Sequence, residues 1–310
     1  MSEAEYDLII VGGGPAGLTA GLYAARAMLK AVLLEKGAVG GQVLLTDWID
    51  NYPGFPEGIS GFELVDKMAA QAARFGLETR LGSVVAMALA GPVKRLTLEG
   101  GGELTAKAVI IATGARPRQL GVPGEVELTG KGVSYCATCD APFYRGQEVA
   151  VVGGGNTAVE EAVYLTRFAA KVYVIHRRNE LRATRIVQEE AFANDKVEFI
   201  LDTQVRRVRG NDQGVEGLEL LGNDGAERFL PVSGVFMLIG TQPNNDMLPL
   251  TELAADPYGF IPTDAEMRTR LPGVMAAGDI RSKAVRQVVN AAGEGAVAVL
   301  AAEEYLHRHG

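Results

Sequence analysis

The fold is decided by residues 6–17, which read YDLIIVGGGPAG. The apolar run 6–11 has the length of a buried strand, and three glycines follow it directly. Pro15 suits the first turn of a helix, where its missing N–H costs nothing, and this helix is expected to reach about residue 30. A second strand, expected over 31–34, ends at Glu35. Together these features predict a dinucleotide-binding βαβ unit with a G-x-G-x-x-G turn.

The same pattern recurs at 148–176, where an apolar run is followed by GGGNTA, a helix expected from 158 to about 169 and a strand that ends at His176. Gly12 maps to Gly153 and Glu35 to His176 with the same offset of 141 positions. An equal offset at two landmarks favours two copies of one dinucleotide-binding fold. Two unrelated tight turns are the alternative interpretation.

The second unit is predicted to be inserted in the first. Apolar strands at 109–114 and 235–240 each end in glycine and run into a Pro-containing stretch. We interpret these stretches as crossings between the two units, near 114–118 and near 242–246. The predicted domain boundaries place 1–115 and 245–310 in the first domain and 116–244 in the second.

The two copies differ where their second strand ends. Glu35 can accept hydrogen bonds from ribose hydroxyls and would repel a 2′-phosphate, so the first site suits FAD or NAD(H). The second copy has HRRNELR at 176–182, and its three arginines can pair with a 2′-phosphate. The sequence therefore predicts NADPH at the second site. A solvated basic surface loop is the alternative.

Two dinucleotides in one chain indicate a flavoprotein that receives a hydride from a nicotinamide. Asp279 ends a strand expected over 274–279 and would reach the ribityl chain of the flavin. Arg286 and Gln287 lie near the start of a helix expected over 284–306 and could help to hold the flavin ring system. An ordinary helix N-cap is the alternative role for Asp279.

The chain has two cysteines, Cys136 and Cys139, within CATCD at 136–140. A structural zinc site needs four ligands, and the three histidines of the chain are poorly spaced to complete one. The pair therefore predicts a redox dithiol and no metal site, with zinc and inert thiols as alternatives. Asp140 is a candidate proton donor or acceptor for this dithiol, or else a turn-forming residue.

Composition excludes several classes of protein. The net charge of −8 argues against a nucleic-acid-binding protein. The chain has no run of 18 apolar residues that could span a bilayer, and Met1–Glu5 lack the positive charge of a signal peptide. Two cysteines cannot form a secreted disulfide framework. We therefore expect a soluble, cytoplasmic protein without a membrane partner.

Together these motifs resemble the low-molecular-weight thioredoxin reductases over essentially the whole chain. The CATCD segment, just before the second glycine turn, is the most specific shared feature, and Asn245 departs from the Thr that is more common in this family. The matching motifs are GGGPAG at 12–17, GGQ at 40–42, NYPGF at 51–55, ATGA at 112–115, CATCD at 136–140, GGGNTAVEEA at 153–162, HRRNELRA at 176–183 and GDIRSKAVRQVVNAAGEGA at 278–296.

The resemblance implies an α/β fold with two Rossmann-like three-layer dinucleotide-binding domains, the NADPH domain being inserted in the FAD domain. It implies that Cys139 faces the flavin, that Cys136 attacks the disulfide of oxidised thioredoxin, and that Asp140 is the general acid–base group. The implied FAD residues are Gly12, Gly14, Pro15, Glu35, Gly41, Gln42, Asn51, Val84, Asp279, Arg286 and Gln287. The implied NADPH residues are Gly153, Gly155, Asn156, Thr157, His176, Arg177, Arg178 and Arg182.

The resemblance also implies a homodimer. The nicotinamide site and the dithiol belong to the inserted domain, yet both must reach one flavin in the other domain. We therefore expect this domain to rotate about the two crossings between half-reactions. A flavin dithiol oxidase and a flavin-binding redox sensor are rival functions, and the arginine cluster argues against the oxidase because an oxidase has no need of NADPH.

Overall fold

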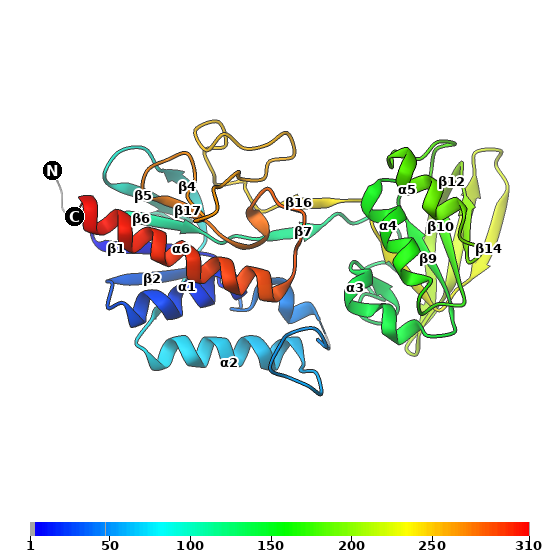
Figure 1. The fold of residues 1–310 in the computed structure, drawn as a ribbon, viewed down its shortest axis with the longest axis horizontal. Helices are drawn as coiled ribbons and strands as arrows, with labels where there is room; N and C mark the ends of the chain where they lie inside the picture. Colours follow the sequence, from blue (N-terminus) through cyan, green and yellow to red (C-terminus); the bar gives the residue numbers. More distant parts are fainter. Residues whose placement is uncertain (1–3, 47, 310) are drawn as a thin grey trace. The chain divides into compact units, whose positions relative to one another are not determined.

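The computed structural model describes residues 4–46 and 48–309, which form two compact units (Figure 1). Unit 1 comprises the chain up to Arg116 and from Gln242 onward, and unit 2 comprises Pro117–Thr241. Unit 2 is therefore an insertion in unit 1. In the described residues, no helix is both long enough and apolar enough to cross a membrane.

Unit 1 is built on a mixed sheet with a parallel centre. Its strands, in sheet order, are β3 (Glu78–Leu81), β2 (Ala31–Glu35), β1 (Tyr6–Val11), β6 (Glu103–Ile111), β5 (Lys94–Leu98) and β4 (Val84–Ala88), with β17 (Val274–Ala276) also beside β6. Strand β6 has two different partners on one side. Its first half pairs antiparallel with β5, as Ala106 does with Lys94, and its second half pairs parallel with β17, as Val109 does with Val274.

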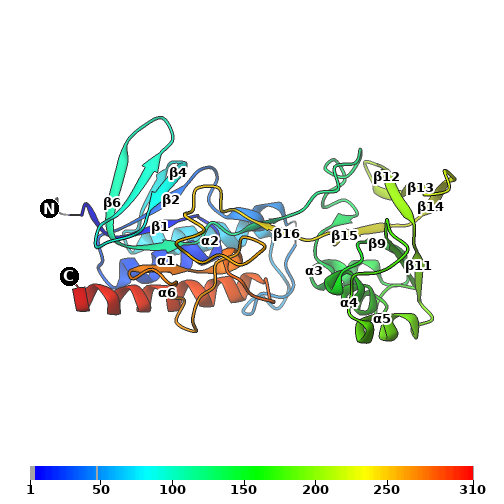
Figure 2. The ribbon, with the colours of Figure 1, turned by 90° about the horizontal axis from the view of Figure 1, so that it is seen from above.

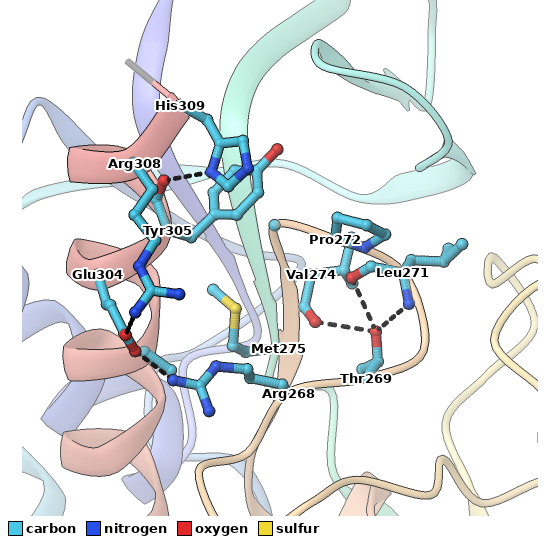
Figure 3. Close-up of a pocket in the computed structure, with 12 residues that line it drawn as sticks. Arg268, Thr269, Leu271, Pro272, Val274, Met275, Glu304, Tyr305, Arg308 and His309 are labelled. Atoms are coloured by element: carbon cyan, nitrogen blue, oxygen red, sulfur yellow. Dashed lines mark hydrogen bonds and ion pairs between the residues drawn. The ribbon is translucent and has the colours of Figure 1, made fainter.

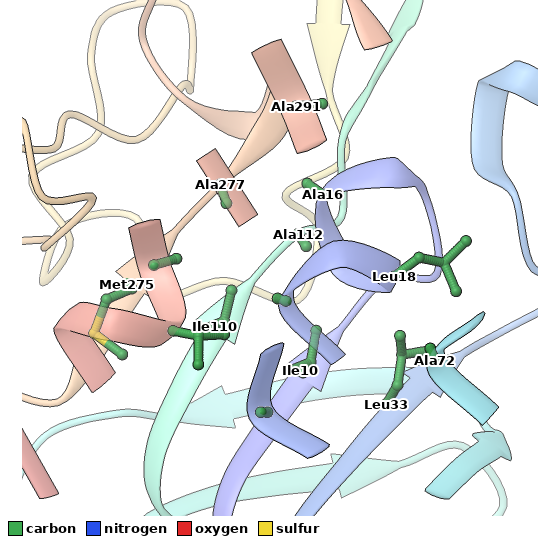
Figure 4. Close-up of a cluster of buried hydrophobic side chains, with 14 of the residues drawn as sticks. Ile10, Ala16, Leu18, Leu33, Ala72, Ile110, Ala112, Met275, Ala277 and Ala291 are labelled. Carbon is green, nitrogen blue, oxygen red and sulfur yellow. The ribbon is translucent and has the colours of Figure 1, made fainter. Parts of the chain in front are cut away.

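Both faces of this sheet are covered, which explains the continuous apolar run 8–11 in β1. Leu8 and Ile10 point into the core below the helices α1 (Pro15–Arg26), α2 (Gly61–Arg74) and α6 (Val288–His309), as Figure 4 shows for Ile10. The alternate residues Ile9 and Val11 point into a second core with strands β4 and β5. Helix α6 runs beside α1 in both views (Figures 1 and 2).

The turn after β1 brings α1 against β6 at a distance that only glycine permits. Gly12 has φ +109°, and a Cβ there would lie 2.3 Å from the carbonyl oxygen of Ala112. A Cβ at Gly17 would lie 1.8 Å from the carbonyl oxygen of Gly12. The first and last glycines of the G-x-G-x-x-G motif, Gly12 and Gly17, are therefore required by the packing of this unit, independently of any ligand.

Unit 2 combines a parallel sheet with a separate antiparallel one. In sheet order, the parallel strands are β11 (Val197–Ile200), β10 (Lys171–Ile175), β9 (Glu148–Val152), β15 (Gly234–Met237) and β8 (Val133–Ser134). The antiparallel strands are β12 (Thr203–Asn211), β13 (Gly214–Gly222) and β14 (Glu227–Pro231). The helices are α3 (Ala137–Asp140), α4 (Asn156–Leu165) and α5 (Arg185–Phe192), and a 3₁₀ turn, η2 (Ala141–Tyr144), follows α3.

The two chain segments that join the units pair with each other as strands β7 (Ala115–Pro117) and β16 (Thr241–Pro243). The N–H of Arg118 donates to the carbonyl of Gly240 at 2.9 Å, and the N–H of Asn244 donates to the carbonyl of Gly114 at 3.0 Å. The chain thus leaves unit 1 and returns to it through one two-stranded ribbon.

Several helix and strand ends differ from the sequence-based expectation. Helix α1 ends at Arg26 instead of about residue 30, because Met28 takes a left-handed conformation with φ +58°. Helix α6 begins at Val288 instead of 284, and the preceding segment is held by ion pairs from Arg281 and Lys283 to Glu294. These ion pairs fasten the segment before the helix to a side chain within it.

The strand expected over 274–279 ends at Ala276. It is followed by a 3₁₀ turn, η3 (Gly278–Ile280), which contains Asp279. Asp279 is thus presented by a tight turn and not by the end of a strand. The helix expected at 158–169 is α4, which begins earlier, at Asn156, and ends at Leu165.

Two glycines in α6 provide a test of the α1–α6 contact. A Cβ at Gly295 would lie 2.2 Å from the carbonyl oxygen of Ala16, whereas a Cβ at Gly293 would meet no atom within 4 Å. We expect Gly295→Ala to lower the free energy of unfolding by about 1–3 kcal/mol. The matched variant Gly293→Ala should raise it by about 0.5–1 kcal/mol through helix propensity. Urea unfolding followed by the fluorescence of Trp48, the single tryptophan, measures both, and equal effects would contradict the packing.

Candidate functional site

The two glycine turns have the same geometry in the two units. In each, the N–H of the first glycine donates to a carbonyl of the second strand, at 2.8 Å for Gly12 and 3.1 Å for Gly153. The helix that follows is capped by Gly14 in unit 1 and by Gly155 in unit 2, and a Cβ at either glycine would meet no atom within 4 Å. Open space beside the first N–H groups of a helix, here with Pro15 at the start of α1, suits a pyrophosphate.

In unit 1 the carboxylate of Glu35, at the end of β2, is held against the glycine turn. Its Oε2 accepts the N–H of Gly13 at 2.7 Å, and its Oε1 accepts the N–H of Gly37 at 3.0 Å. Each oxygen keeps a second lone pair that can accept from a ribose hydroxyl. A negative charge fixed at this place disfavours a 2′-phosphate, so this turn fits FAD or NAD(H) better than NADPH.

Three buried polar atoms of unit 1 have no hydrogen-bond partner within the described residues. They are Oγ1 of Thr113, Oδ1 of Asp279 and Nε of Arg286. Burial raises the pKa of Asp279, and the cations of Lys283 and Arg286 oppose this rise. Buried polar groups are normally hydrogen-bonded, so these atoms fit a polar ligand such as the ribityl and pyrophosphate chain of FAD.

The fold places Asp279 beside the start of α1. A Cβ at Gly278 would lie 2.9 Å from the Cβ of Ala16, so the 3₁₀ turn touches the helix directly. The N–H of Gly278 donates to Glu294 of α6 at 2.7 Å. The Nζ of Lys283 lies 3.0 Å from Glu294 and 3.5 Å from Oδ1 of Asp279. These contacts fix the turn that carries Asp279 beside the start of α1 and place a cation 3.5 Å from its carboxylate.

Four other residues predicted to hold FAD form two neighbouring pairs, Gly41 with Gln42 and Asn51 with Gln287. Gly41 begins the 3₁₀ helix η1 (Gly41–Leu45), and its Cβ position lies 3.3 Å from the Cα of Gly14, which puts the exposed Gln42 next to the turn. The Nδ2 of Asn51 donates to Oε1 of Gln287 at 3.1 Å, although these residues are 236 positions apart. The second pair adjoins Arg286 in the chain.

Val84 is placed differently from the other predicted FAD residues. Its side chain is buried in the core on the sheet face opposite α1, so only its backbone is left to contact a ligand. The start of β4 lies near the end of β2, because the N–H of Gly82 donates to the carbonyl of Glu35 at 2.9 Å. A backbone contact carries no signal in the sequence.

In unit 2 a buried imidazole takes the place of Glu35. The ring of His176 lies over the middle glycine of the turn, since a Cβ at Gly154 would be 2.4 Å from its Nδ1. Its Nε2 is buried without a hydrogen-bond partner in the described part of the chain. Burial lowers the pKa of His176, and the charges of Arg182, Arg178 and Arg177 lower it further. The ring is therefore neutral at pH 7.

The three arginines beside His176 form an exposed cationic cluster. Arg177, Arg178 and Arg182 are all exposed, and none makes an ion pair with a side chain in the described segments. The loop that carries them is fastened to the turn, because the N–H of Arg182 donates to the carbonyl of Gly154 at 2.6 Å. This cluster suits a 2′-phosphate.

Asn156 and Thr157 are exposed at the start of α4. The Oδ1 of Asn156 accepts the N–H of Thr184 at 2.7 Å, which ties the helix to the far end of the arginine loop. Thr157 lies in the first turn of the helix, where unpaired N–H groups are available to a phosphate. The turn, the histidine and the arginines therefore adjoin one another in one unit, and they fit NADPH.

The redox pair is also in unit 2. Cys136 and Cys139 are joined by a disulfide with a Cα–Cα distance of 5.4 Å, and Cys136 is the N-cap of α3. The Oγ of Ser134 accepts the N–H of Cys136 at 3.1 Å and donates to its carbonyl at 3.3 Å. The N–H of Ala137 donates to the carboxylate of Glu161 in α4 at 2.8 Å. Side chains on two elements thus hold the backbone on both sides of Cys136.

A buried carboxylate supports the residue before Cys136. Glu125 is fully buried, and it accepts the N–H groups of Leu120 at 2.9 Å and Gly121 at 2.7 Å. It also accepts the hydroxyl of Tyr135 at 3.1 Å. Burial, together with the Glu125 charge, raises the pKa of Tyr135 to about 12. Tyr135 therefore stays a neutral donor that anchors the strand leading to the disulfide.

Asp140 is the last residue of α3, and its N–H donates to the carbonyl of Cys136 at 3.2 Å. Its side chain is half-buried. Burial raises the pKa of Tyr144 to about 12, and the charge of Asp140 contributes to this rise. The carboxylate of Asp140 belongs to the residue that follows Cys139 in the chain.

Two residues that the structure brings into these sites were not predicted from the sequence. Thr113, with its unpaired Oγ1, lies in the ATGA segment, and Glu161 lies in the GGGNTAVEEA segment. Both segments were recognised as motifs, but periodicity and spacing give no reason to assign a role to either side chain. Their roles depend on contacts between distant elements.

Two other features of the described residues carry no part of the site. A hollow of about 220 Å³ at the end of α6 is bordered by Tyr305 and by Arg268 and Arg308, which both pair with Glu304 (Figure 3). None of the predicted site residues lines it. Among residues 4–46 and 48–309, no group of three or more His, Cys, Asp or Glu side chains is placed to hold a metal ion.

Comparison with known proteins agrees with this geometry. The family model of the pyridine nucleotide-disulphide oxidoreductases matches residues 6–295. A thioredoxin reductase of Listeria monocytogenes is 46% identical, with 98% of this chain and 95% of the relative covered. The crystal structure of thioredoxin reductase from Streptococcus pyogenes is 47% identical and covers 99% of this chain and 100% of that one, with a TM-score of 0.93.

A crystal structure of Lactococcus lactis thioredoxin reductase, described as the FR conformation, is 42% identical and covers 98% of this chain and 100% of that one. Its TM-score is 0.67. The fold and site thus define a two-domain α/β protein built for dinucleotides and a redox disulfide. The chain belongs to the pyridine nucleotide-disulphide oxidoreductase family.

The lowered pKa of His176 makes the stability of unit 2 depend on pH. Below its ordinary pKa of 6.5, the unfolded chain binds a proton that the buried ring resists, so stability falls as the pH decreases through this range. We expect His176→Gln to reduce the change in stability between about pH 7.5 and 5.5, whereas the exposed His307→Gln should not. Hydrogen exchange of peptides from β9 and β10 measures this, and an unchanged slope in His176→Gln would refute the assignment.

Proposed function

We propose that this chain is an NADPH-dependent thioredoxin reductase, a flavoprotein that reduces the disulfide of oxidised thioredoxin. The observation that carries the proposal is the Cys136–Cys139 disulfide in the unit whose glycine turn adjoins three arginines. A dithiol oxidase has no use for a 2′-phosphate site, and this chain keeps Arg177, Arg178 and Arg182 exposed. The relatives with this name are similar over nearly their whole length.

Within this proposal, unit 1 holds FAD and unit 2 holds NADPH. The orphaned polar atoms and the Glu35 carboxylate support the first assignment, and the arginine cluster supports the second. The proposed FAD residues are Gly12, Gly14, Pro15, Glu35, Gly41, Gln42, Asn51, Val84, Asp279, Arg286 and Gln287. The proposed NADPH residues are Gly153, Gly155, Asn156, Thr157, His176, Arg177, Arg178 and Arg182.

When bound, the flavin supplies a two-electron relay between the nicotinamide and the disulfide. The residues of the chain do the thiol chemistry. In the reduced protein the Cys136 thiolate attacks one sulfur of the thioredoxin disulfide, forming a mixed disulfide and releasing the other sulfur as a thiolate. Cys139 then attacks Cys136, which closes the protein disulfide and releases reduced thioredoxin. Asp140 exchanges the protons that these steps require.

The proposal includes a rotation of unit 2 between half-reactions, about the β7–β16 ribbon. Two relatives support it. They are 47% and 42% identical to this chain and almost completely covered, yet their TM-scores are 0.93 and 0.67. Similar sequences with such different superpositions are typical of proteins whose domains take more than one relative arrangement.

The oligomeric state, the cellular location and the partners are proposed from the resemblance to this family. We propose that the chain forms a homodimer and acts in the cytoplasm, with thioredoxin as its protein substrate and without a nucleic-acid or membrane partner. A single assay tests the activity: the oxidation of NADPH by the purified yellow protein, with and without oxidised thioredoxin. Oxidation that does not depend on thioredoxin would overturn the proposal.

Cys136→Ser separates the two halves of the reaction. We expect this variant to lose thioredoxin reduction completely, because the attacking thiolate is absent. NADPH should still bleach its flavin, since the glycine turns, Glu35 and the arginines remain. Anaerobic absorbance spectra with NADPH, followed by the thioredoxin assay on the same sample, measure both. A variant that still turns over thioredoxin would disprove the role of Cys136.

The arginine cluster can be tested by coenzyme preference. Charge-assisted contacts contribute about 1.5–3 kcal/mol each, so each arginine lost should raise the KM for NADPH about tenfold or more. We expect the double variant Arg177→Ala, Arg178→Ala to change the KM for NADH much less. The exposed Arg206 on β12 provides a control, Arg206→Ala, that should leave both constants unchanged. An unaltered preference in the double variant would show that the 2′-phosphate binds elsewhere.

A further inference from the structure

The half-buried Glu161 contacts α3, the helix that contains Cys139 and is capped by Cys136. The reaction described above assigns no role to Glu161. It lies on α4, and its Oε2 accepts the N–H of Ala137 at 2.8 Å. Ala137 follows Cys136 directly and is fully buried. The carboxylate therefore lies at the first backbone N–H of α3, next to the cysteine that caps this helix.

We propose that Glu161 is a positioning residue for the Cys136–Cys139 pair, and that its negative charge at the Ala137 N–H keeps the dithiol strongly reducing. The hydrogen bond joins α4, which begins at the second glycine turn, to the helix that carries the disulfide. The proposal deepens the thioredoxin reductase function proposed above, because that function requires the dithiol to pass its electrons onward.

The physical argument concerns the charge on reduced Cys136. A thiolate at the start of a helix is stabilised by the first free N–H groups, and this stabilisation makes a dithiol less reducing. Here Glu161 engages the N–H of Ala137 and adds a negative charge beside the thiolate. Both effects disfavour the thiolate, destabilise the reduced form and make the reduction potential of the pair more negative.

Other charged and polar groups near Cys136 are the same in the wild type and in a Glu161 variant, so a comparison of the two isolates the effect of Glu161. Asp140 lies on α3, at the far end of this short helix, and Glu160 is exposed on α4. The Oγ1 of Thr138 lies 3.4 Å from the Sγ of Cys136 and carries no charge. Burial raises the pKa of the Glu161 carboxyl, the Ala137 N–H opposes this rise, and the Glu160 charge adds to it.

The test measures the reduction potential of the holoenzyme disulfide in buffers of reduced and oxidised dithiothreitol at pH 7, without NADPH or thioredoxin. Reduction of the protein breaks the Cys136–Cys139 bond, and it takes two electrons and two protons from dithiothreitol, which closes its own disulfide. Thiols are then trapped with a maleimide and counted by mass. Because the chain has only these two cysteines, the count is unambiguous.

Glu161→Gln retains an acceptor for the Ala137 N–H but removes the charge. We expect its equilibrium with dithiothreitol to shift about tenfold toward the reduced protein, which corresponds to about 30 mV. The adjacent control Glu160→Gln should shift it less than about twofold, or about 9 mV. Glu161→Ala, which also loses the acceptor, should shift it at least as far as Glu161→Gln and lower the melting temperature as well.

Flavin content and melting temperature near those of the wild type establish that Glu161→Gln is folded. A potential equal to that of the wild type, or one that is more negative, overturns the proposal and reduces Glu161 to a structural hydrogen-bond acceptor. This outcome is distinguishable from failure of the proposed function, because the measurement uses neither substrate. A protein that shows the potential shift but ignores thioredoxin would contradict only the proposed function.

Discussion

A backbone carbonyl of the neighbouring strand occupies the place where a side chain at the first turn glycine would lie. A Cβ at Gly12 would be 2.3 Å from the carbonyl oxygen of Ala112, and one at Gly153 would be 2.4 Å from that of Leu238. This close packing brings the start of each helix to the carboxyl end of its sheet, where open space adjoins the free N–H groups. Everything proposed for the two nucleotide sites depends on this constraint.

Because the two turns share one geometry, the difference between the sites comes from the residue over the middle glycine. In unit 1 this residue is Glu35, whose carboxylate bonds to the turn itself. In unit 2 it is His176, a neutral ring surrounded by cations. One backbone arrangement, used twice, thus offers a negative environment to one ribose and a positive environment to the other.

The sequence predicted those parts of the molecule that are set by local chemistry. Strands β1 and β9, both glycine turns and the acid-to-histidine exchange follow from periodicity and spacing, and Asp279 from a motif. The features that the sequence did not predict are determined by tertiary contacts. Arg281 and Lys283, which precede helix α6, pair with Glu294 within it, and the roles of Thr113 and Glu161 depend on contacts between distant elements. Val84 is assigned to the FAD site by the resemblance alone, because no distinctive motif surrounds it.

The dithiol, too, has features that the sequence predicts and features that depend on tertiary contacts. The spacing of Cys136 and Cys139 is enough to indicate a redox pair. The side chains that support this pair lie on three different segments of unit 2. Ser134 fixes the backbone of Cys136, Glu125 anchors Tyr135, and Glu161 holds the helix from α4. Every one of these supports lies within the unit that carries the disulfide, so the redox centre keeps its local geometry wherever that unit moves.

The pairing of β7 with β16 has an evolutionary consequence. Since the inserted unit starts and finishes on adjacent strands, its two ends are one hydrogen bond apart, as the 2.9 Å contact between Arg118 and Gly240 illustrates. A gene segment encoding such a unit can be acquired, exchanged or duplicated in one recombination event without breaking the host sheet. A duplication of this kind would produce the equal separations that are found between Gly12 and Glu35 and between Gly153 and His176.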